Sequence, residues 1–476
     1  MSVRTRFAPS PTGFLHVGSA RTALYAWLYA RRHDGQFILR IEDTDKEREV
    51  EGAIGHVMES LRWLGIEWDE GVDVDGPYAP YIQSQRLSLY RTYAEQLLAA
   101  GFAYPDPYTE EEVAAFRAKA EEEKRPFLFR DHRPDTVAEW DGSRPLRFRT
   151  PRIARYEWHD AVLGNLSAGE EALDDFILIK SDGYPTYNFA HVVDDIEMKI
   201  THVMRGQEFV SSTPKFLALY EALDVAPPVF ATLPPILGES GTKKLSKRDG
   251  AKDVLDYKRE GYLPEALINF LALLGWNPGG DEEFFTPDQL VASFALERVQ
   301  RSGAQFNEEK LLHLNREWMR TLADDGYLAQ LGYDGDITVL ARALPILKER
   351  AQTFGEARLM LETELDFLFT APTLESALLC AKEPSERPGC TKEMLSLVLA
   401  TLRTESDQST PEAVKELLMP IADLEEAKGK GGRGAMLWPL RYALSGKERS
   451  PDPFTLVAVL GTEEAISRVE SALAIL

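Results

Sequence analysis

The alternation of strands and helices near the start of the chain most constrains how it can fold. Residues 4–8 are typical of a buried strand that runs into a Pro/Gly turn, and residues 21–32 carry apolar side chains at helical spacing. A second strand is expected at 37–41 and a charged helix at 44–64. Strand, helix, strand and helix in this order favour a doubly wound parallel sheet of the Rossmann type. Because ligands of such sheets bind at the carboxyl ends of the strands, the turn at 9–18 is the first candidate for a site.

The rest of the chain divides into an insertion and a helical half. Residues 101–189 combine a charged helix with strand-like alternation, which indicates an α/β insertion between two parts of a Rossmann-type domain, 1–100 and 190–250. The segments beyond 320 that show helical period are 338–350, 355–370, 391–404, 411–420 and 463–475. We therefore expect an α/β N-terminal half and an all-α C-terminal half. The helical half would comprise domains at 251–320 and 321–476, the latter divisible near residue 375.

The chain is strongly acidic, but its basic residues are clustered. The 476 residues carry a net charge of −23, and the pI is near 4.9. This average argues against indiscriminate binding to nucleic acid, because phosphate contacts need cations, but a binding footprint is local. Five arginines and no acid lie between Arg144 and Arg155, and further basic clusters lie at 243–248 and 428–433. Each cluster predicts either a contact with phosphate or ordinary solvated surface charge.

The first chemical motif is Arg6-Phe-Ala-Pro-Ser-Pro-Thr-Gly-Phe-Leu-His-Val-Gly-Ser-Ala-Arg21. Two prolines fix the turn, and a helix begins near His16. The N-terminus of a helix offers unpaired N–H groups and a partial positive charge to a phosphate, and Gly18 lets a nucleotide lie against the backbone. His16 can donate a hydrogen bond to charge that develops on the α- or β-phosphate. A histidine in a turn is also common as a purely structural residue.

The second motif is Lys244-Leu-Ser-Lys-Arg248, in a segment flanked by glycines. Lysines here can neutralise a departing pyrophosphate in the transition state, which is electrostatic catalysis. Lys247 is the first candidate for this role and Lys244 the second. A solvated run of basic residues is the alternative explanation, so this motif gains its meaning beside the first one.

Together, in this order and more than two hundred residues apart, the two motifs resemble the HIGH and KMSKS signatures of class I aminoacyl-tRNA synthetases. The surrounding sequence is similar to that of the bacterial glutamyl-tRNA synthetases. The segments that carry this resemblance are RFAPSPTGFLHVGSARTALYAW, ILRIEDTD, QSQRLSLY, DGYPTYNFAHVVDD, HVMRGQEFVSSTPK, KKLSKRDGA and NFLALLGW. The resemblance spans residues 3–320 and continues less closely through RGAMLWPLRYALSG at 433–446. Two departures are Leu245 in place of methionine and Arg248 in place of the final serine.

The resemblance implies that ATP with Mg²⁺, L-glutamate and the glutamate tRNA are substrates. Glutamate would attack the α-phosphate to give glutamyl-adenylate and pyrophosphate. The 2′-hydroxyl of the terminal adenosine of the tRNA would then take the glutamyl group. The resemblance also implies that 101–189 holds the acceptor end, 251–320 contacts the stem and 321–476 reads the anticodon. RNA bases stack on aromatic or arginine side chains, and the candidates for anticodon contacts are Arg350, Arg358, Arg433, Trp438 and Arg441.

A pocket for glutamate needs two cationic clamps and an anion, because glutamate has two carboxylates and one ammonium group. Arg6, with Tyr187 beside it, is assigned to the side-chain carboxylate and Arg205 to the other, although the reverse assignment also fits. Glu42 is assigned to the ammonium group. The other expected glutamate contacts are Ala8, Ser10 and His191, the last at a position where relatives often carry another residue. The expected ATP contacts are Pro11, Thr12, Gly18, Glu208, Ile236 and Lys247.

Several other functions are weighed against this one. A glutaminyl-tRNA synthetase would carry β-barrels in place of the helical C-terminal half, and a truncated ligase that modifies a tRNA base would end where that half begins. A non-catalytic tRNA-binding paralogue would have decayed signatures, whereas His16, Gly18, Lys244 and Lys247 are all present. A small-molecule nucleotidyltransferase would not need the helical half. An enzyme of relaxed specificity that also charges the glutamine tRNA with glutamate stays open.

No metal site is expected. Many relatives bind zinc through cysteines in the insertion, but here Tyr104-Pro-Asp-Pro-Tyr108 stands in that region without a cysteine. Cys380 and Cys390 form no CxxC pair and fit free thiols in a reducing cytosol. The longest apolar stretches are too short to span a bilayer, and the first residues lack the apolar segment of a signal peptide. We expect a cytoplasmic monomer without membrane contact.

Overall fold

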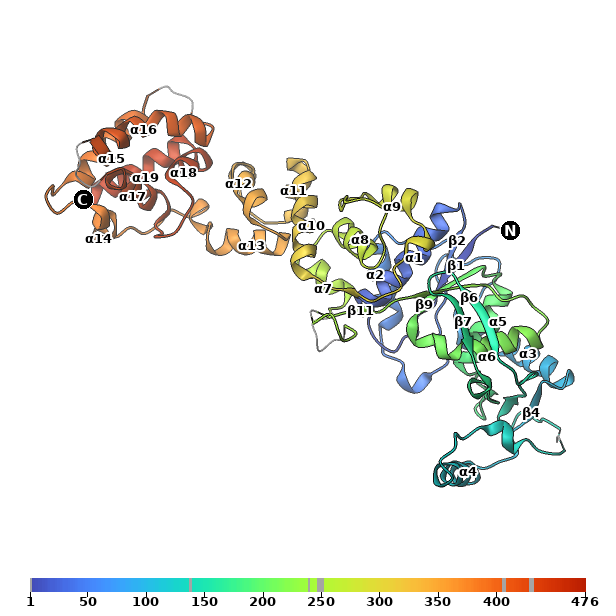
Figure 1. Ribbon diagram of the computed structural model, residues 1–476. Helices are drawn as coiled ribbons and strands as arrows, with labels where there is room; N and C mark the ends of the chain where they lie inside the picture. Colours follow the sequence, from blue (N-terminus) through green and yellow to red (C-terminus); the bar gives the residue numbers. More distant parts are fainter. Residues whose placement is uncertain (1, 137–138, 239, 246–251, 405–407, 428–431) are drawn as a thin grey trace. The chain divides into compact units, whose positions relative to one another are not determined.

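The computed structural model describes residues 2–136, 139–238, 240–245, 252–404, 408–427 and 432–476 (Figure 1). The chain forms two compact units. The first comprises Met1–Lys258 with Pro264–Leu314, and the second comprises Arg259–Leu263 with Asn315–Leu476. The first unit contains parallel strands and helices, and the second is helical throughout its described part. The predicted α/β and all-α halves are therefore confirmed.

The main sheet of the first unit consists of two hydrogen-bonded parts, β1-β2-β3 and β7-β6-β10-β9, which meet at β1 (Arg4–Phe7) and β9 (His202–Gly206). β1 pairs in parallel with β2 (Gln36–Leu39), and β2 pairs in parallel with the short β3 (Glu70–Gly71). The backbone N–H of Thr201 donates to the carbonyl of Arg4 at 2.9 Å, which holds the start of β9 beside β1. The chain therefore builds outward from β1 on one side and from β9 on the other, which is the strand order of a doubly wound sheet.

β10 (Val229–Leu233) extends the sheet by pairing in parallel with β9 and, at one position, with β6 (Tyr156–Asp160). β6 forms an antiparallel hairpin with β7 (Gly164–Ala168). Both β6 and β7 come from the segment 101–189. Part of the predicted insertion thus joins the main sheet, where Asp160 accepts hydrogen bonds from the N–H and hydroxyl of Thr232.

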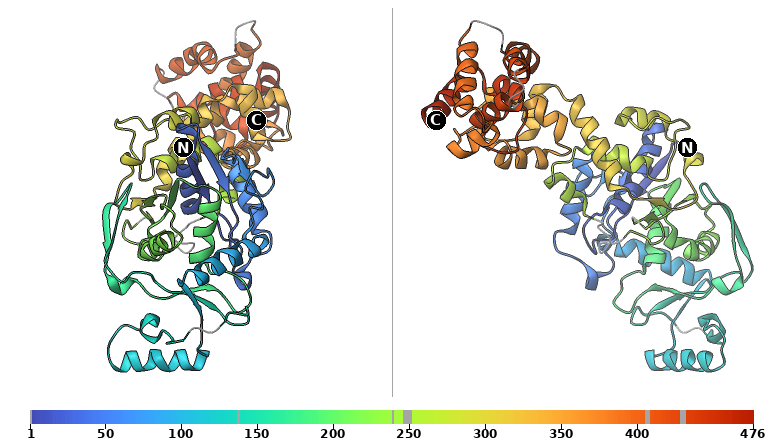
Figure 2. Two further views of the ribbon diagram at one scale, coloured as in Figure 1. Left: turned by 90° about the vertical axis from the view of Figure 1, so that its right-hand side faces the viewer. Right: turned by 60° about the vertical axis from the view of Figure 1, so that its left-hand side comes forward.

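The rest of the insertion is a small antiparallel sheet and a projecting helix. The strands of this sheet are β4 (Ala103–Pro105), β5 (Leu146–Phe148) and β8 (Ile177–Ile179). Helix α4 (Glu110–Glu122) begins at a capping box, in which Thr109 Oγ1 accepts from the N–H of Glu112 and the Glu112 carboxylate accepts from the N–H of Thr109. Figures 1 and 2 show α4 standing apart from both sheets.

Helix α1 (Val17–Arg32) packs against β1, β2 and β9 and is anchored on its other side to the end of α8 (Pro264–Leu273). The guanidinium of Arg21 donates to the carbonyl of Leu274 at 2.8 Å, and the hydroxyl of Tyr25 donates to that of Ala272 at 3.0 Å. Cations and donors near a helix C-terminus satisfy its last carbonyls. These contacts fix α1 on both sides.

The charged helix expected at 44–64 is shorter than predicted. The structure has one turn of 3₁₀ helix at Lys46–Arg48, and α2 begins later, at Ala53–Trp63. Gly52 precedes α2 with φ of 78°, a left-handed conformation that ends any continuous helix. The sequence pattern alone does not reveal this break, because a single glycine inside a helical pattern costs only about 1 kcal/mol.

The first unit contains several further elements around the sheet. They are α3 (Leu87–Ala99), α5 (Tyr187–Glu197), α6 (Thr213–Ala222), β11 (Ile236–Leu237), α7 (Val254–Arg259), α9 (Pro287–Ser293) and β12 (Ala304–Gln305). β11 pairs in parallel with β12. Helix α10 (Glu308–Thr321) contains the division between the two units.

The second unit consists of helices joined by short loops. They are α11 (Asp324–Leu331), α12 (Ile337–Arg350), α13 (Phe354–Thr363), α14 (Ser376–Leu379), α15 (Cys390–Leu402), α16 (Pro411–Ala427), α17 (Gly434–Ser445), α18 (Pro453–Leu460) and α19 (Thr462–Ala474). The five predicted segments correspond to α12, α13, α15, α16 and α19. The prediction did not include the short helices α11 and α14, nor α17, nor α18, which is apolar on nearly every side and so shows no helical period. In the described parts of the chain, no helix is both long and apolar enough to cross a membrane.

Candidate active site

A cavity of about 440 Å³ opens where β1 and β9 end. Its walls are formed by residues at the ends of three strands and in the segments that follow them: Arg6–Ser10 from β1, Thr12–His16 in the next turn, Arg205–Phe209 from β9 and Leu233–Ile236 from β10. This is the edge of the sheet at which the fold predicts a ligand. The predicted site residues on the cavity wall are Arg6, Ala8, Ser10, Thr12, His16, Gly18, Glu42, Tyr187, Arg205, Glu208, Ile236 and Lys244.

Of the described residues predicted to bind ATP or glutamate, Pro11 and His191 are not on this wall. Pro11 is buried, and its carbonyl accepts from the N–H of Val50 at 2.8 Å. His191 lies behind Tyr187, as described below. Lys247, the first candidate for electrostatic catalysis, lies outside the described residues.

His16 caps the N-terminus of α1 with its own ring. Its Nδ1 accepts hydrogen bonds from the backbone N–H groups of Gly18 and Ser19 at 3.1 and 3.4 Å. The helix end is therefore not open as predicted, since two of its N–H groups turn to the imidazole. Because Nδ1 accepts, a neutral ring carries its hydrogen on Nε2, which lies 3.3 Å from Ser19 Oγ. Nε2 is the atom through which His16 can donate to a ligand.

Gly18 makes room for this ring. A Cβ at Gly18 would lie 3.0 Å from Cε1 and 3.1 Å from Nδ1 of His16. Contacts this short would displace the imidazole or the helix start. The close approach of a nucleotide to Gly18 stays a prediction, but the glycine already has a reason in the protein alone.

Arg6 is held at the end of β1 by acceptors behind the cavity. Its Nε and one terminal nitrogen donate to the carboxylate of Asp195 at 3.2 and 3.4 Å, and the other terminal nitrogen donates to the carbonyl of Met204 at 3.4 Å. Burial opposes ionisation of Asp195, but Arg6 and Arg40 together lower its pKa to about 2. Arg6 is thus a neutralised cation whose position is set from α5.

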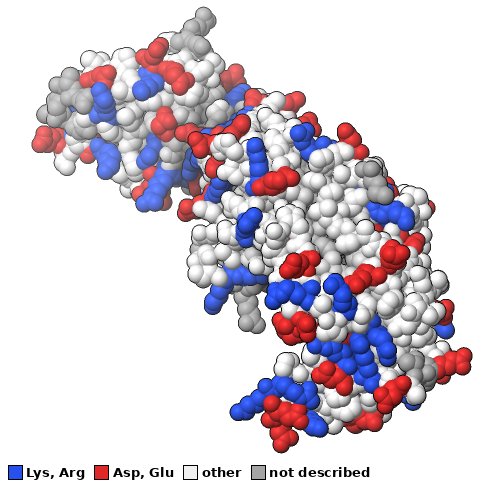
Figure 3. Space-filling view, turned by 45° about the vertical axis from the view of Figure 1, so that its right-hand side comes forward, with Lys and Arg blue, Asp and Glu red and all other residues white. Residues whose placement is uncertain are grey.

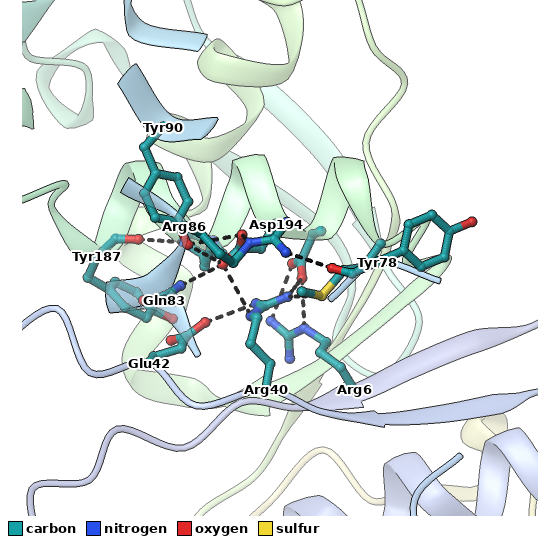
Figure 4. Close-up of polar contacts among 12 residues, drawn as sticks. Arg6, Arg40, Glu42, Tyr78, Gln83, Arg86, Tyr90, Tyr187 and Asp194 are labelled. Atoms are coloured by element: carbon teal, nitrogen blue, oxygen red, sulfur yellow. Dashed lines mark hydrogen bonds and ion pairs between the residues drawn. The ribbon is translucent and has the colours of Figure 1, made fainter. Parts of the chain in front are cut away.

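Arg40 joins a buried ion-pair network that the sequence analysis did not predict (Figure 4). It donates to Asp195 at 2.8 Å and to Glu42 at 2.9 Å, and its Nε lies 3.5 Å from Asp194. Asp194 also accepts from Arg86 at 2.8 Å. The signal in the sequence was an arginine inside an apolar strand and two adjacent acids in an apolar helix. Such charges almost never become fully buried unless they are paired.

Glu42 connects this network to the cavity. Burial raises the pKa of its carboxyl, and the attraction of Arg40 and Arg6 opposes that shift. Its hydrogen bond from Arg40 orients the carboxylate, while the residue lines the cavity. A carboxylate fixed in this way can accept hydrogen bonds from an ammonium group.

Among the described residues, no carboxylate forms an ion pair with the buried guanidinium of Arg205. Its one hydrogen bond runs from a terminal nitrogen to Thr213 Oγ1 at 2.7 Å, and its carbon Cζ lies 4.8 and 4.6 Å from the ring centres of Phe216 and Phe230. Its Nε and other terminal nitrogen are buried and have no hydrogen-bond acceptor among the described residues. Burial lowers the pKa of Arg205 to about 10. A buried N–H group that makes no hydrogen bond destabilises the protein, so the guanidinium of Arg205 marks a place where an anion should bind.

His191 supports Tyr187 from behind. The two rings stack with centres 4.8 Å apart and planes at 15°, and His191 Nδ1 lies 2.8 Å from the carbonyl of Tyr187. Burial lowers the pKa of His191 to about 3, so the ring is neutral at pH 7. His191 was predicted to contact glutamate, but it does not line the cavity. Its structural effect is to hold Tyr187, which does.

The other side of the cavity presents the groups predicted for ATP. Lys244 Nζ lies 3.3 Å from the Glu208 carboxylate, and both side chains are exposed. Lys244 also forms an antiparallel bridge with Leu237 of β11, and the N–H of Leu245 donates to the carbonyl of Ile236 at 2.8 Å. These contacts hold the first part of the lysine segment against the cavity wall. The Lys244–Glu208 pair is solvated and contributes little to stability, so a phosphate can compete for the lysine.

The arginine cluster of the insertion divides by burial. Arg147 is buried, donates to Asp106 and to the carbonyl of Asp175, and therefore belongs to the core of the insertion. Arg144, Arg152 and Arg155 are exposed. Figure 3 shows Lys and Arg side chains gathered in patches on one face of the molecule, although the chain carries a net charge of −23.

The predicted anticodon residues lie in the second unit and all have partners there. Arg350 pairs with Glu364 at 2.5 Å, Arg358 donates to the carbonyl of Leu331 at 3.0 Å, and Arg433 pairs with Asp423 at 2.9 Å. Trp438 Nε1 donates to the carbonyl of Leu378 at 2.8 Å, and Arg441 lies over its ring. Arg350 and Arg433 are exposed, whereas the other three are half-buried. Contact with RNA stays a prediction for all five.

Two family models match the chain. The model for tRNA synthetases class I (E and Q), catalytic domain, matches residues 2–313, and the model for an anticodon binding domain matches residues 310–473. The glutamate–tRNA ligase of Anaeromyxobacter sp. is 40% identical over 99% of this chain and 99% of its own length. The glutamate–tRNA ligase of Heliobacterium modesticaldum is 41% identical over 99% of this chain and 97% of its own.

Solved structures are similar over the full length as well. The crystal structure of a glutamate–tRNA ligase from Elizabethkingia meningosepticum in complex with its amino acid has a TM-score of 0.87 and 34% identity. That comparison covers 100% of this chain and 99% of the other. The glutamate–tRNA synthetase from Elizabethkingia anophelis has a TM-score of 0.84 and 34% identity, and the comparison covers 100% of both chains.

Proposed function

Because this chain belongs to the class I tRNA synthetases for glutamate and glutamine, we infer that it is a glutamate–tRNA ligase that uses ATP. Glutamate–tRNA ligases match the chain over nearly its whole length, and family models match both a catalytic and an anticodon-binding part. The finer assignments that follow are proposals about its own residues. They rest on the cavity at the ends of β1 and β9.

The observation that carries the choice of amino acid is the unpaired guanidinium of Arg205. A substrate carboxylate can accept hydrogen bonds from both buried N–H donors of Arg205 at once, so that neither donor stays without a partner. Arg6 already forms an ion pair with Asp195, so its guanidinium is held in place and its charge is largely neutralised. We assign one glutamate carboxylate to Arg205 and the other to Arg6 with Tyr187.

The buried charges around the pocket favour glutamate over glutamine. The charged groups of this cluster are the guanidinium groups of Arg6, Arg40, Arg86 and Arg205 and the carboxylates of Glu42, Asp194 and Asp195. Within this set, the guanidinium of Arg205 has no carboxylate as an ion-pair partner among the described residues. Glutamate carries a net charge of −1 and neutralises it, whereas glutamine carries none. The ammonium group of glutamate would donate hydrogen bonds to Glu42, and Ala8 and Ser10 would add backbone and hydroxyl contacts.

ATP would occupy the side of the cavity formed by the two signatures. Thr12, Gly18, Glu208 and Ile236 line this side, and Pro11 shapes the turn beneath it. Mg²⁺ would arrive with the phosphates of ATP, because Mg²⁺ is commonly held by substrate phosphates. The glutamate α-carboxylate oxygen attacks the α-phosphorus, the bond to the β,γ-phosphate breaks, and pyrophosphate leaves.

The proposed catalytic groups stabilise charge and do not form bonds. His16 donates from Nε2 to the phosphate oxygens, and Lys244 and Lys247 neutralise the leaving pyrophosphate. The 2′-hydroxyl of the terminal adenosine then attacks the carbonyl carbon of glutamyl-adenylate, and AMP leaves. No protein nucleophile is needed, so positioning and electrostatics supply the rate.

The tRNA would contact both units. We propose that the insertion, 101–189, holds the acceptor end through exposed arginines such as Arg144 and Arg155. The segment 251–320 would contact the stem, and the helices of 321–476 would read the anticodon through the residues named above.

We propose that the insertion folds without zinc. Asp106, the acid in the segment where relatives carry cysteines, pairs with Arg147, and Asp175 pairs with Arg133 at 2.7 Å. These acids are committed to arginines and do not fit a metal site. We further propose a cytoplasmic monomer.

The test of the proposed function is aminoacylation with labelled glutamate and ATP, using separate transcripts of the glutamate tRNA and the glutamine tRNA. Charging of the first alone is the expected result. Charging of both would keep the activity and establish a relaxed enzyme, which is the second candidate. Charging of neither would contradict the proposed function and favour a tRNA-binding paralogue.

A further inference from the structure

Leu15, next to the catalytic histidine, is held on both sides of its backbone. Its N–H donates to Nδ1 of His56 at 3.3 Å, and its carbonyl accepts from the N–H of Val254 at 2.9 Å. His16 forms an antiparallel bridge with Asp253 beside this contact. The first signature is thus joined directly to the chain that follows the lysine segment.

His56 closes this contact into a ring. It lies in the first turn of α2, and its Nε2 is 3.3 Å from Oδ1 of Asp253. Because Nδ1 accepts from Leu15, the neutral ring carries its hydrogen on Nε2 and donates it to Asp253. His56 therefore touches both segments at once, with one nitrogen for each.

Phe14 fixes the plane of the His56 ring. The two rings stack with centres 4.4 Å apart and planes at 13°. Phe14 lines the cavity, and 44% of its surface is exposed. The stack therefore links His56 to the cavity wall without placing His56 on it.

Lys244 and Asp253 are each attached to a described element. Leu237 of β11 bridges Lys244, and His16 bridges Asp253. If Asp253 moved away from Leu15, the bridge to His16 would be lost. In the proposed function His16 donates to the phosphates of ATP, and misplacing a catalytic group by about 1 Å can cost 100-fold in rate.

We propose that His56 is a positioning residue for the ATP step, which holds Asp253 against Leu15 and so fixes the backbone of the first signature beside His16. It would act through Leu15 and Asp253 and touch no substrate. This inference rests on the proposed function, because it assigns His56 to the adenylate-forming reaction.

The fold does not depend on this histidine alone. The start of α7 has its own cap, in which Asp253 Oδ1 accepts from the N–H of Asp256 at 3.0 Å and the Asp256 carboxylate accepts from the N–H of Asp253 at 3.1 Å. The His56 side chain is partly solvent-exposed. Replacing His56 should therefore remove its contacts with Leu15 and Asp253 and leave helices α2 and α7 folded.

The experiment is pyrophosphate exchange with the full chain, glutamate, ATP and a transcript of the glutamate tRNA. The variants are His56→Ala, which cuts both links, and His56→Gln, which can keep the donor to Asp253. The control is His33→Ala, an exposed histidine at the other end of α1. Active sites are counted by the adenylate burst, so that loss of folded protein is separated from loss of rate.

The expected result for His56→Ala is a tenfold lower kcat/KM for ATP with the KM for glutamate unchanged within twofold. His56→Gln should lie between this variant and the wild type, and His33→Ala should match the wild type. In the double variant His56→Ala with Asp253→Asn, the loss should not exceed that of the worse single variant, because both act through one link.

Two outcomes would overturn the inference. One is an unchanged kcat/KM for ATP in His56→Ala. The other is an equal loss for ATP and glutamate together with a lower melting temperature, which would make His56 a structural residue only. A wild-type enzyme that exchanges no pyrophosphate with glutamate would contradict the proposed function, and this inference with it.

Discussion

At the scale of single residues, the cavity is defined by which charges have partners. Arg6 has Asp195, whereas Arg205 has aromatic rings and one hydroxyl around it. The face of an aromatic ring attracts a guanidinium, but it does not replace the hydrogen-bond acceptors that the N–H groups need in the guanidinium plane. The two arginines look alike in the sequence, and their environments give them different tasks.

Replacing Arg205 should separate binding from stability. Arg205→Met removes a donor pair for a buried carboxylate, so we expect the KM for glutamate to rise about 100-fold, or about 3 kcal/mol. The same change removes an unpaired buried cation, so the melting temperature without substrate should rise. Steady-state kinetics and thermal unfolding measure the two effects.

A suitable control for this variant is Arg32→Met, an exposed arginine in the last turn of α1. It should change neither quantity. An unchanged KM for glutamate in Arg205→Met would remove Arg205 from the pocket.

His191 should make stability depend on pH. Its pKa of about 3 lies below the usual 6.5, so between these values the unfolded chain binds a proton that the folded chain does not. Stability therefore falls as the pH drops from 6.5 toward 3, by about 1.4 kcal/mol per pH unit for this group. His191→Asn cannot titrate and can keep a donor to Tyr187.

Urea unfolding of the wild type and His191→Asn at several pH values between 5 and 7.5 tests this. The wild-type free energy of unfolding should fall more steeply toward acid than that of the variant. Parallel curves would mean that His191 binds its proton equally well in the folded and the unfolded chain, which would contradict the lowered pKa.

At the scale of elements, the start of α1 combines a helix cap with a candidate catalytic group. The His16 ring satisfies two N–H groups that usually need a Ser, Thr, Asp or Asn side chain. Its Nε2 is left on the cavity side of this arrangement, beside Ser19. The cap and the chemistry therefore depend on one ring orientation.

A methyl group at Gly18 should disturb that orientation. In Gly18→Ala the new Cβ meets the imidazole at 3.0–3.1 Å, so the ring must move. We expect loss of the cap to cost about 1 kcal/mol of stability and the rate of adenylate formation to fall at least about tenfold. Pyrophosphate exchange and thermal unfolding measure these effects.

A matched control is Gly326→Ala, in helix α11 of the second unit. A Cβ there has nothing within 4 Å. Equal effects of the two substitutions would contradict the argument from the His16 ring.

At the scale of the whole molecule, an acidic chain is proposed to bind an acidic polymer. The exposed arginines of the insertion and the candidates in the second unit are local exceptions to the net charge of −23. Such an arrangement weakens binding to arbitrary nucleic acid and favours the docked position in which basic patches meet phosphates.

Removing exposed arginines should therefore change the salt dependence of tRNA binding. Arg144→Gln and Arg155→Gln should each lower the slope of log K against log salt by about 1, if each contacts a phosphate. The glutamate KM should stay the same. Arg32→Gln serves as the control, and binding at several salt concentrations is the measurement.

Local sequence patterns were sufficient to predict the fold class and the edge of the sheet at which the cavity lies. Strand and helix periods predict the α/β and all-α halves, and the turn after β1 predicts the cavity edge, because these depend on local pattern and on a general property of parallel sheets. The two signatures and their spacing predicted the family. The break at Gly52 and helices α11, α14, α17 and α18 were missed. One left-handed glycine leaves no mark on the pattern, α11 and α14 are too short to show a helical period, and α18 is apolar on nearly every side.

The ion pairs and hydrogen bonds of the site residues depend on the tertiary packing and could not be predicted from the sequence. Arg40 and Asp195 lie 155 positions apart in the chain, and their ion pair exists because β2 and α5 meet in the core. The same packing leaves Arg205 without an acid, turns His191 behind Tyr187 and brings His56 between Leu15 and Asp253. The energy of a charge depends on the three-dimensional distances to its neighbours and on its burial. Residue type and spacing along the chain do not contain these quantities.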